Sequence, residues 1–431
     1  MSCVSWQFFK FGVQWFTHGA FAAVAPTGAR MANSPRASSD LQGASRLAVS
    51  AIIGVADILE HFHLNLMLLA ERGGVPVHDA LPDATRLGYR LLRKVTQVVG
   101  LGLDGVLTKL QPLLGEGSGW PGRETALAVL TGVLGDYLQA RHNPLAIPMQ
   151  LRCAGQPLSL QREALAAAVP DARGRVLLLI HGLCMNDLQW GSEQHNHGTA
   201  LAAELGYTPL FLHYNTGLHI SINGRLLSGL LQTLQAQWPV PLQELVIIGH
   251  SMGGLLARSA CHYAALSQAA WLPRLSRLVC MASPHHGAPL ERGGNWFHVI
   301  TDISALTRPF SQLGKIRSAG ITDLRYGNII DQDWGEHDRF AHVGDQRHPV
   351  PLPESVACYA MAATTGKSVG DLSDRLIGDG LVPLASALGR HDDPAFCLDF
   401  PPERQWIGYE LNHIEMLQRQ DVYQQLLAWL R

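Results

Sequence analysis

Long uninterrupted apolar runs and blocks of like charge are both scarce in this sequence of 431 residues. In the apolar N-terminal stretch over residues 46–71, Asp57 and Glu60 interrupt the pattern, so we expect no transmembrane helix there. Charged residues make up only 16% of the chain, and the formal net charge is −2. Because nucleic-acid binding requires clustered positive charge to neutralise phosphates, we expect no nucleic-acid partner.

Paired cysteines are also missing. The seven cysteines are scattered and form no Cys-x-x-Cys pair, which is unlike a disulfide framework or a zinc site. The apolar residues 11–25 are a poor secretory signal, because His18 interrupts them and only Lys10 supplies positive charge ahead of them. We therefore expect a cytoplasmic protein without a bound metal or organic cofactor.

The remaining patterns divide the chain into three parts. Residues 1–44 are predicted to be a disordered leader and linker, because their last part is rich in small and polar residues. Residues 45–141 carry apolar residues at helical spacing, which predicts three helices, over 46–71, over 85–110 and around 127–138. In residues 143–431, short apolar runs typical of strands alternate with helical patterns, and this part is predicted to form the catalytic domain.

The predicted helix over 85–110 has two sides of different character. Leu87, Leu91 and Val95 fall on an apolar stripe, whereas arginines and a lysine gather on another side, at positions 86, 90, 93 and 94. Such a helix can dock on the rest of the protein with its charged side in water, which we favour. It can also lie on an anionic membrane surface, so a peripheral membrane contact stays open.

Strands and helices alternate after residue 143. Apolar runs predict strands over 146–153, 156–160, 175–180, 210–214, 244–248, 277–282, 356–363 and within 404–409. Helices are predicted between several of them and at the C-terminus. This alternation implies an α/β fold, in which a mostly parallel central sheet is covered by helices on both faces. The active site of such a sheet lies at the carboxyl ends of its strands.

The strand over 244–248 leads into the segment Gly249-His250-Ser251-Met252-Gly253. A serine between two such glycines, after a buried strand and before a helix, is typical of a nucleophile elbow. The glycines lack the side chains that would clash in this tight turn. Ser368 stands in a second Gly-x-Ser-x-Gly match, but no tightly packed helix is predicted after it. We therefore interpret Ser251 as the nucleophile.

The other catalytic groups are predicted at neighbouring strand ends. The oxyanion hole should consist of the Leu183 N–H, which follows His181-Gly182, and the Met252 N–H. Asp379 lies between two glycines and His413 lies before the terminal helix, so they are the predicted acid and base of the triad. Four aspartates and one histidine remain as weaker alternatives: Asp371, Asp374, Asp392, Asp393 and His391.

The motifs IHGL, GHSMGG, SPHHG, GDGLVP and the late Asn412-His413 occur in this order. Together they resemble the α/β-hydrolase superfamily, on its branch of lipases and GPI inositol-deacylase-like serine esterases. The resemblance covers residues 143–431. It implies an α/β-hydrolase fold that carries, in this chain, a cap insertion at about 288–353 and the N-terminal helical extension.

The predicted cap and the loops near the elbow supply candidates for substrate binding. Trp296 and Phe297 lie in the insertion, Trp190 follows the predicted strand over 175–180, and Tyr214 is the last residue of the predicted strand over 210–214. Apolar residues in the insertion predict either a lid over an acyl pocket or helices packed over the sheet. The double histidine His285-His286 is interpreted as part of a structural turn, because no further metal ligands have suitable spacing.

Three functions are compatible with these residues. The favoured hypothesis is a serine hydrolase that cleaves carboxylic or lipid esters through an acyl-enzyme. An acyltransferase would use the same triad with an alcohol or amine in place of water. A non-catalytic interaction protein on a hydrolase scaffold is the third alternative, although the complete set of serine, histidine and aspartate disfavours it.

Overall fold

The computed structural model describes residues 37–72, 80–110, 123–191, 195–288, 317–335, 344–367 and 378–431. Its contacts divide the chain into two compact units. Unit 1 comprises Met1–Pro121 and His142–Leu145, and unit 2 comprises Gly122–Arg141 and Ala146–Arg431. The two units are described separately.

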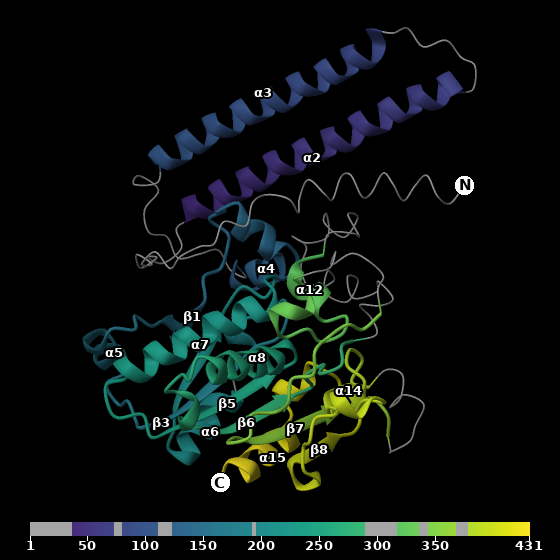
Figure 1. Cartoon of the computed structure of the whole chain (residues 1–431). Coiled ribbons are helices and arrows are strands. Elements are labelled where there is room, and N and C mark those ends of the chain that lie inside the picture. The colour runs from purple at the N-terminus through teal and green to yellow at the C-terminus, as the bar shows by residue number, and fades with distance from the viewer. Residues whose placement is uncertain are drawn as a thin grey trace. The chain divides into compact units, whose positions relative to one another are not determined.

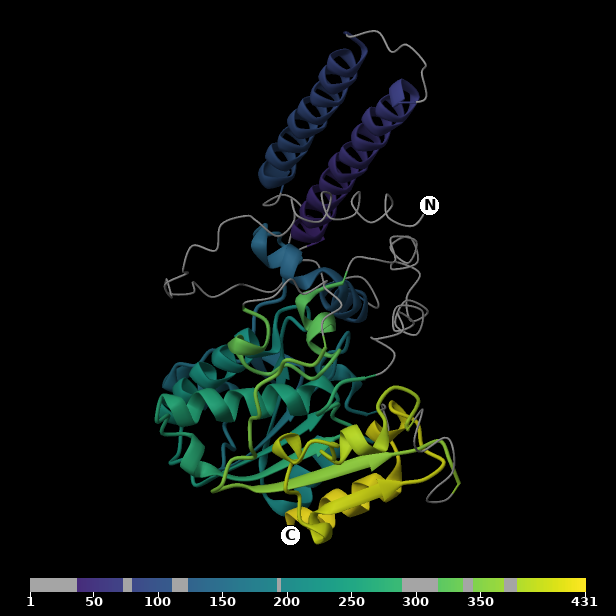
Figure 2. The ribbon, with the colours of Figure 1, turned by 45° about the vertical axis from the view of Figure 1, so that its right-hand side comes forward.

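Unit 1 is built on two long helices, α2 (Ala37–Arg72) and α3 (Ala80–Leu110). They lie side by side and run in opposite directions (Figures 1 and 2). Arg93 of α3 pairs with Asp57 of α2 at 2.7 Å, and Arg46 of α2 pairs with Asp104 of α3 at 2.7 Å. Polar contacts therefore link the facing sides of the hairpin. Among the described residues, no helix is both long and apolar enough to cross a membrane.

The start of α2 differs from the expectation that residues up to 44 form a linker. The helix begins at Ala37, and Asp40 in its first turn interacts favourably with the helix dipole. Gly43 is held by Asn143, whose side-chain amide donates to the Gly43 carbonyl at 3.1 Å. This contact is 100 residues distant in sequence, so local composition could not reveal it.

Unit 2 is built around one eight-stranded sheet with the order β2-β1-β4-β3-β5-β6-β7-β8. The strands are β1 (Gln150–Cys153), β2 (Gln156–Pro157), β3 (Arg175–Ile180), β4 (Thr208–His213), β5 (Glu244–His250), β6 (Leu275–Met281), β7 (Ala357–Ala363) and β8 (Gln405–Gly408). The edge hairpin β1–β2 pairs antiparallel with β4, and the other neighbours pair in parallel. All eight predicted strands are present, with ends shifted by a few residues.

Helices cover both faces of this sheet (Figures 1 and 2). Among the described residues, the α-helices of unit 2 are α4 (Arg123–Ala140), α5 (Arg162–Ala168), α6 (His197–Leu205), α7 (Ile220–Gln237), α8 (Met252–Leu266), α12 (Ala319–Asp323), α14 (Leu384–Ala387) and α15 (Gln420–Leu430). In β3, Val176 and Leu178 pack with α7 and α8, whereas Leu177 and Leu179 pack with α6 and α15. This alternation explains why β3 reads as a continuous apolar run. The predicted α/β-hydrolase fold is confirmed.

Helix α4 packs within unit 2, although the sequence analysis groups it with the N-terminal helices. It has no polar face, because its buried residues surround it, among them Val129, Leu130 and Val133. A helix that is apolar all round must lie inside a core. One of its partners is a described segment of the predicted cap insertion: the Ser318 hydroxyl and the Ala319 N–H, at the start of α12, donate to α4. Figure 1 shows α4 and α12 together beyond one end of the sheet.

Candidate active site

The turn between β5 and α8 holds Ser251 in a strained conformation. Ser251 has φ 55° and ψ −125°, a region that side-chain-bearing residues rarely adopt. Its N–H donates to the Met281 carbonyl at 2.7 Å. A Cβ on Gly249 would lie 2.5 Å from the Gly254 nitrogen, and one on Gly253 would lie 2.3 Å from the Ile180 carbonyl oxygen. Both glycines are therefore required for the close approach of strand, turn and helix.

Asp379 and His413 meet in a buried pair. The His413 Nδ1 and the Asp379 Oδ2 lie 2.7 Å apart, and both residues are at least 95% buried. The second carboxylate oxygen, Oδ1, accepts from the Leu381 and Val382 N–H groups at 3.0 and 2.8 Å. The His413 N–H also donates to the Asp379 carbonyl at 3.0 Å. The loop thus holds the carboxylate in place. The carboxylate in turn orients the His413 ring through Nδ1, so that Nε2 is the ring nitrogen not engaged by Asp379.

His250 is a residue of this site to which the sequence analysis assigns no role. It precedes Ser251, and its Nε2 donates to the His413 carbonyl at 3.0 Å. The two rings lie 4.6 Å apart, centroid to centroid. Burial and the neighbouring His413 hold the pKa of His250 well below its usual value, so the ring is neutral. His250 therefore couples the serine turn to the histidine loop. Its place in the GHSMGG motif was the available signal.

The loop after β3 closely approaches the serine. A Cβ on Gly182 would lie 2.9 Å from the Ser251 Cβ, so only glycine allows this approach. The Leu183 N–H that follows donates no hydrogen bond within the described part of the chain. Met252 is the first residue of α8, where a backbone N–H has no acceptor within the helix. Among the described residues, neither the Leu183 N–H nor the Met252 N–H therefore has an acceptor.

Helix α4 supports this loop from behind. Cys184 has φ 60°, and its N–H donates to the Thr216 hydroxyl at 3.2 Å. A Cβ on Gly132 of α4 would lie 2.1 Å from the Cys184 sulfur. On the next turn, the Gly135 carbonyl accepts from the Asn215 side-chain amide at 2.9 Å. The small residues of α4 therefore let the helix pack directly on the loops after β3 and β4.

Two of the predicted substrate-binding residues lie inside the core. Tyr214 is 1% exposed, stacks on His181 at 4.6 Å and donates from its hydroxyl to the His181 carbonyl. Burial lowers the pKa of His181 to about 3, so this ring is neutral. Trp190 is also 1% exposed, and its ring lies edge-on to His250 at 6.4 Å. In this structure both rings support the residues around the serine.

Several predicted candidates lie outside the described residues: Trp296, Phe297, Ser368, Asp371 and Asp374. The remaining rival groups are described, and no hydrogen bond among the described residues joins them to the Asp379–His413 pair. Asp393 caps a short helical turn by accepting from the Ala395 N–H at 2.9 Å. His391 accepts from the Asp393 N–H, and Asp392 is exposed.

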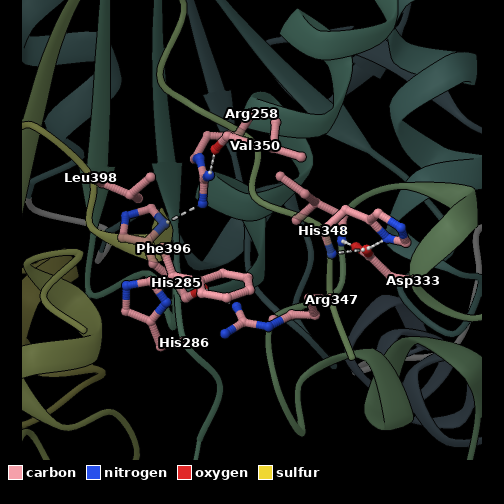
Figure 3. A pocket seen from close by; sticks show the side chains of 11 residues that line it. Arg258, His285, His286, Asp333, Arg347, His348, Val350, Phe396 and Leu398 are labelled. Carbon is pink, nitrogen blue, oxygen red and sulfur yellow. Dashed lines mark hydrogen bonds and ion pairs between the residues drawn. The ribbon is translucent and has the colours of Figure 1, made fainter. Parts of the chain in front are cut away.

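The motif SPHHG borders a separate cavity (Figure 3). Arg258 donates to the Val350 carbonyl at 2.6 Å and lies 3.1 Å from the His285 Nδ1. Arg347 donates to the His285 carbonyl at 2.8 Å. Burial lowers the pKa of His286 to about 4. Because Arg258 lies about two turns along α8 from Ser251, these contacts hold a turn of the chain and do not reach the serine. They favour the structural interpretation of the double histidine.

A family model matches residues 171–351 and is described as a PGAP1-like alpha/beta domain. The match begins ahead of β3, includes the elbow between β5 and α8, and ends after α12. It confirms the resemblance to the α/β-hydrolase superfamily on its GPI inositol-deacylase-like branch. No curated protein matches the sequence.

Solved structures similar to this chain include lipases, phospholipases and other α/β hydrolases. The lipase BlEst2 from Bacillus licheniformis in mature form is 15% identical, with a TM-score of 0.39, over 59% of this chain and 91% of that chain. Phospholipase PlaB from Legionella pneumophila is 16% identical, with a TM-score of 0.33, over 49% and 45%. Alpha/beta hydrolase domain-containing protein 10 from mouse is 12% identical, with a TM-score of 0.33, over 60% and 89%.

Proposed function

We propose that this protein is a serine hydrolase that cleaves carboxylic esters through an acyl-enzyme. The observation that carries the proposal is the buried Asp379–His413 pair, joined through His250 to a serine in an elbow conformation. A buried loop with only a structural role has no need of a strained backbone at Ser251. It also has no need of a neutral histidine that links this residue to the His413 loop. The three residues also follow in the chain order typical of this fold.

Acylation uses all of these groups. The Ser251 oxygen attacks the ester carbonyl carbon, and its proton moves to the His413 Nε2. Asp379 holds the ring by its Nδ1–H and stabilises the positive charge that forms. The Leu183 and Met252 N–H groups donate to the negative carbonyl oxygen. When the intermediate collapses, the bond between carbon and alcohol oxygen breaks, and the leaving alcohol takes the proton from Nε2.

Deacylation repeats these steps with water. His413 takes a proton from a water molecule, whose oxygen attacks the acyl carbon. Collapse of the second intermediate breaks the bond to the Ser251 oxygen, which regains its proton from Nε2. The products are a carboxylic acid and an alcohol, and the enzyme returns to its starting state.

A fluorophosphonate probe tests the nucleophile directly. We expect covalent labelling of the folded protein at Ser251 and none in Ser251→Ala. A series of p-nitrophenyl esters of graded chain length, with the same variant as control, then measures ester hydrolysis. A folded protein that is neither labelled nor active would support the non-catalytic scaffold and refute the proposal.

The oxyanion loop has a separate test. In Gly182→Ala the new Cβ would collide with Ser251, so the loop that carries Leu183 must shift. Loss of one oxyanion donor lowers kcat by about 100- to 1,000-fold in comparable sites. Gly229→Ala is the matched control, because a Cβ there meets nothing within 4 Å. Equal activity of both variants would remove Leu183 from the proposed oxyanion hole.

A further inference from the structure

Helix α3 exposes its apolar side. Leu87, Leu91 and Val95 are between 54% and 60% exposed, and the row continues through Val98, Val99 and Leu101 at 54–71%. We call these six residues the apolar face of α3. Single exposed apolar residues are common on soluble proteins, but a continuous row along a helix marks a surface that binds something.

The orientation of α3 within the hairpin explains why these apolar residues are exposed together. Arg93 and Asp104 point to α2, where they pair with Asp57 and Arg46, and Gly100 packs against Val49. At about 100° per residue, Leu91 and Val95 lie roughly 160° around the helix from Arg93. The polar side of α3 therefore faces its neighbour in unit 1, and the apolar side faces outward.

A row of positive charge borders the apolar face. Arg86, Arg90 and Lys94 follow one another at intervals of four residues along one edge of α3. Arg86 pairs with Asp83 at 3.0 Å, whereas within the described residues no carboxylate pairs with Arg90 or Lys94. The edge thus keeps two positive charges available for a partner.

We propose that the apolar face of α3 binds the surface of an anionic lipid bilayer. A helix that lies in the interface needs a broad apolar side, a charged polar side and basic residues at the boundary, and α3 has all three. Its apolar residues enter the outer acyl region, while Arg90 and Lys94 meet lipid phosphates. Negative lipids complement the basic edge, which a neutral apolar partner would leave unpaired. This binding is independent of the proposed ester chemistry.

The test is flotation of the full-length protein with vesicles of phosphatidylcholine, alone or mixed with phosphatidylglycerol. We expect binding to the mixed vesicles that weakens at high salt. Leu91→Gln/Val95→Gln should reduce it by at least about tenfold, because two apolar side chains that enter the acyl region on binding are lost. Arg90→Gln/Lys94→Gln should reduce it by about fivefold per charge. The matched control is Leu226→Gln/Leu266→Gln, which changes exposed leucines of unit 2 and should have no effect.

Other outcomes would overturn the proposal. One is failure of the wild-type protein to bind either vesicle; another is wild-type binding by Leu91→Gln/Val95→Gln. If that variant instead dissociates a dimer in sedimentation, a second copy covers the face. If it lowers the melting temperature of the full chain, the rest of the protein covers it. Circular dichroism confirms that each variant keeps its helices.

Discussion

The two units of this protein use apolar residues in opposite ways. In unit 2, the strands of the sheet alternate their apolar side chains between two covered faces, and Leu256 of α8 is 1% exposed. In unit 1, α3 turns charged residues toward α2 and leaves residues such as Leu91 54% exposed. The first arrangement is complete by itself, whereas the second leaves apolar area in water.

This difference shows that apolar periodicity predicts a helix without predicting what covers it. Both α3 and α4 carry apolar residues at helical spacing. The residues of α4 are buried against loops of unit 2, because its glycines allow close approach to Cys184 and Asn215. Helix α3 has ion pairs on its covered side. The covered side of a helix therefore follows from its partners, and four predictions test the contrast.

The largest effect is expected on removing α4. A chain that starts at Gly122 should keep unit 2 folded, whereas one that starts at His142 should not fold. The lost apolar residues, Val129, Leu130, Val133, Leu134 and Leu138, are buried. At about 1.5–3 kcal/mol each, they account for as much as a whole domain's stability. Circular dichroism and urea unfolding measure the difference. Equal stability of both chains would show that α4 contributes nothing to the unit.

The next effect concerns activity in unit 2. Asp379→Asn should lower kcat by about three to four orders of magnitude, because His413 loses the acceptor that fixes its tautomer. The fold should persist, since the amide oxygen still accepts from the backbone. Asp393→Asn, which changes only a capping residue, should cost less than about tenfold. Comparable losses in both variants would refute the assignment of the acid.

A matched pair of leucines compares the units directly. Leu256→Ala should lower the free energy of unfolding by about 2–5 kcal/mol, because it opens a cavity beneath the sheet. Leu91→Ala should change it by less than about 0.5 kcal/mol, because the side chain is largely in water. Urea unfolding of both variants without lipid gives the two values. A large loss in Leu91→Ala would mean that the face of α3 is covered in solution.

The smallest effect is a dependence of stability on pH. Burial lowers the pKa of His181 to about 3 and that of His197 to about 4, whereas both titrate near 6.5 when unfolded. Between these values the unfolded chain binds more protons, so stability falls as pH decreases from about 6.5 toward 4. Each histidine contributes up to about 1.4 kcal/mol per pH unit.

His197→Gln isolates one of these contributions. The slope of the unfolding free energy against pH should decrease by about the contribution of one histidine, which is up to about 1.4 kcal/mol per pH unit. An unchanged slope in His197→Gln would show that this residue stays accessible to protons in the folded state.

The architecture of unit 2 could be predicted from the amino-acid sequence alone. The central strands β3 and β5 are buried on both faces, so each appears as a short apolar run, and β3 is observed over the predicted residues 175–180. The elbow was also readable, because the constraint on its glycines is local: Gly249 and Gly253 lie two residues from Ser251. Asp379 was singled out by the turn that surrounds it, and its pairing with His413 followed from strand order.

Which surfaces contact one another is visible only in the folded chain. The bridge from His250 to the His413 carbonyl joins residues 163 apart, and the contact of Asn143 with Gly43 spans 100. Helix α4 is apolar all round and packs within unit 2, whereas α3 pairs its charged side with α2 and leaves its apolar face exposed. The physical reason is that periodicity specifies a helix and its apolar side, whereas the partner depends on close packing between segments distant in the chain.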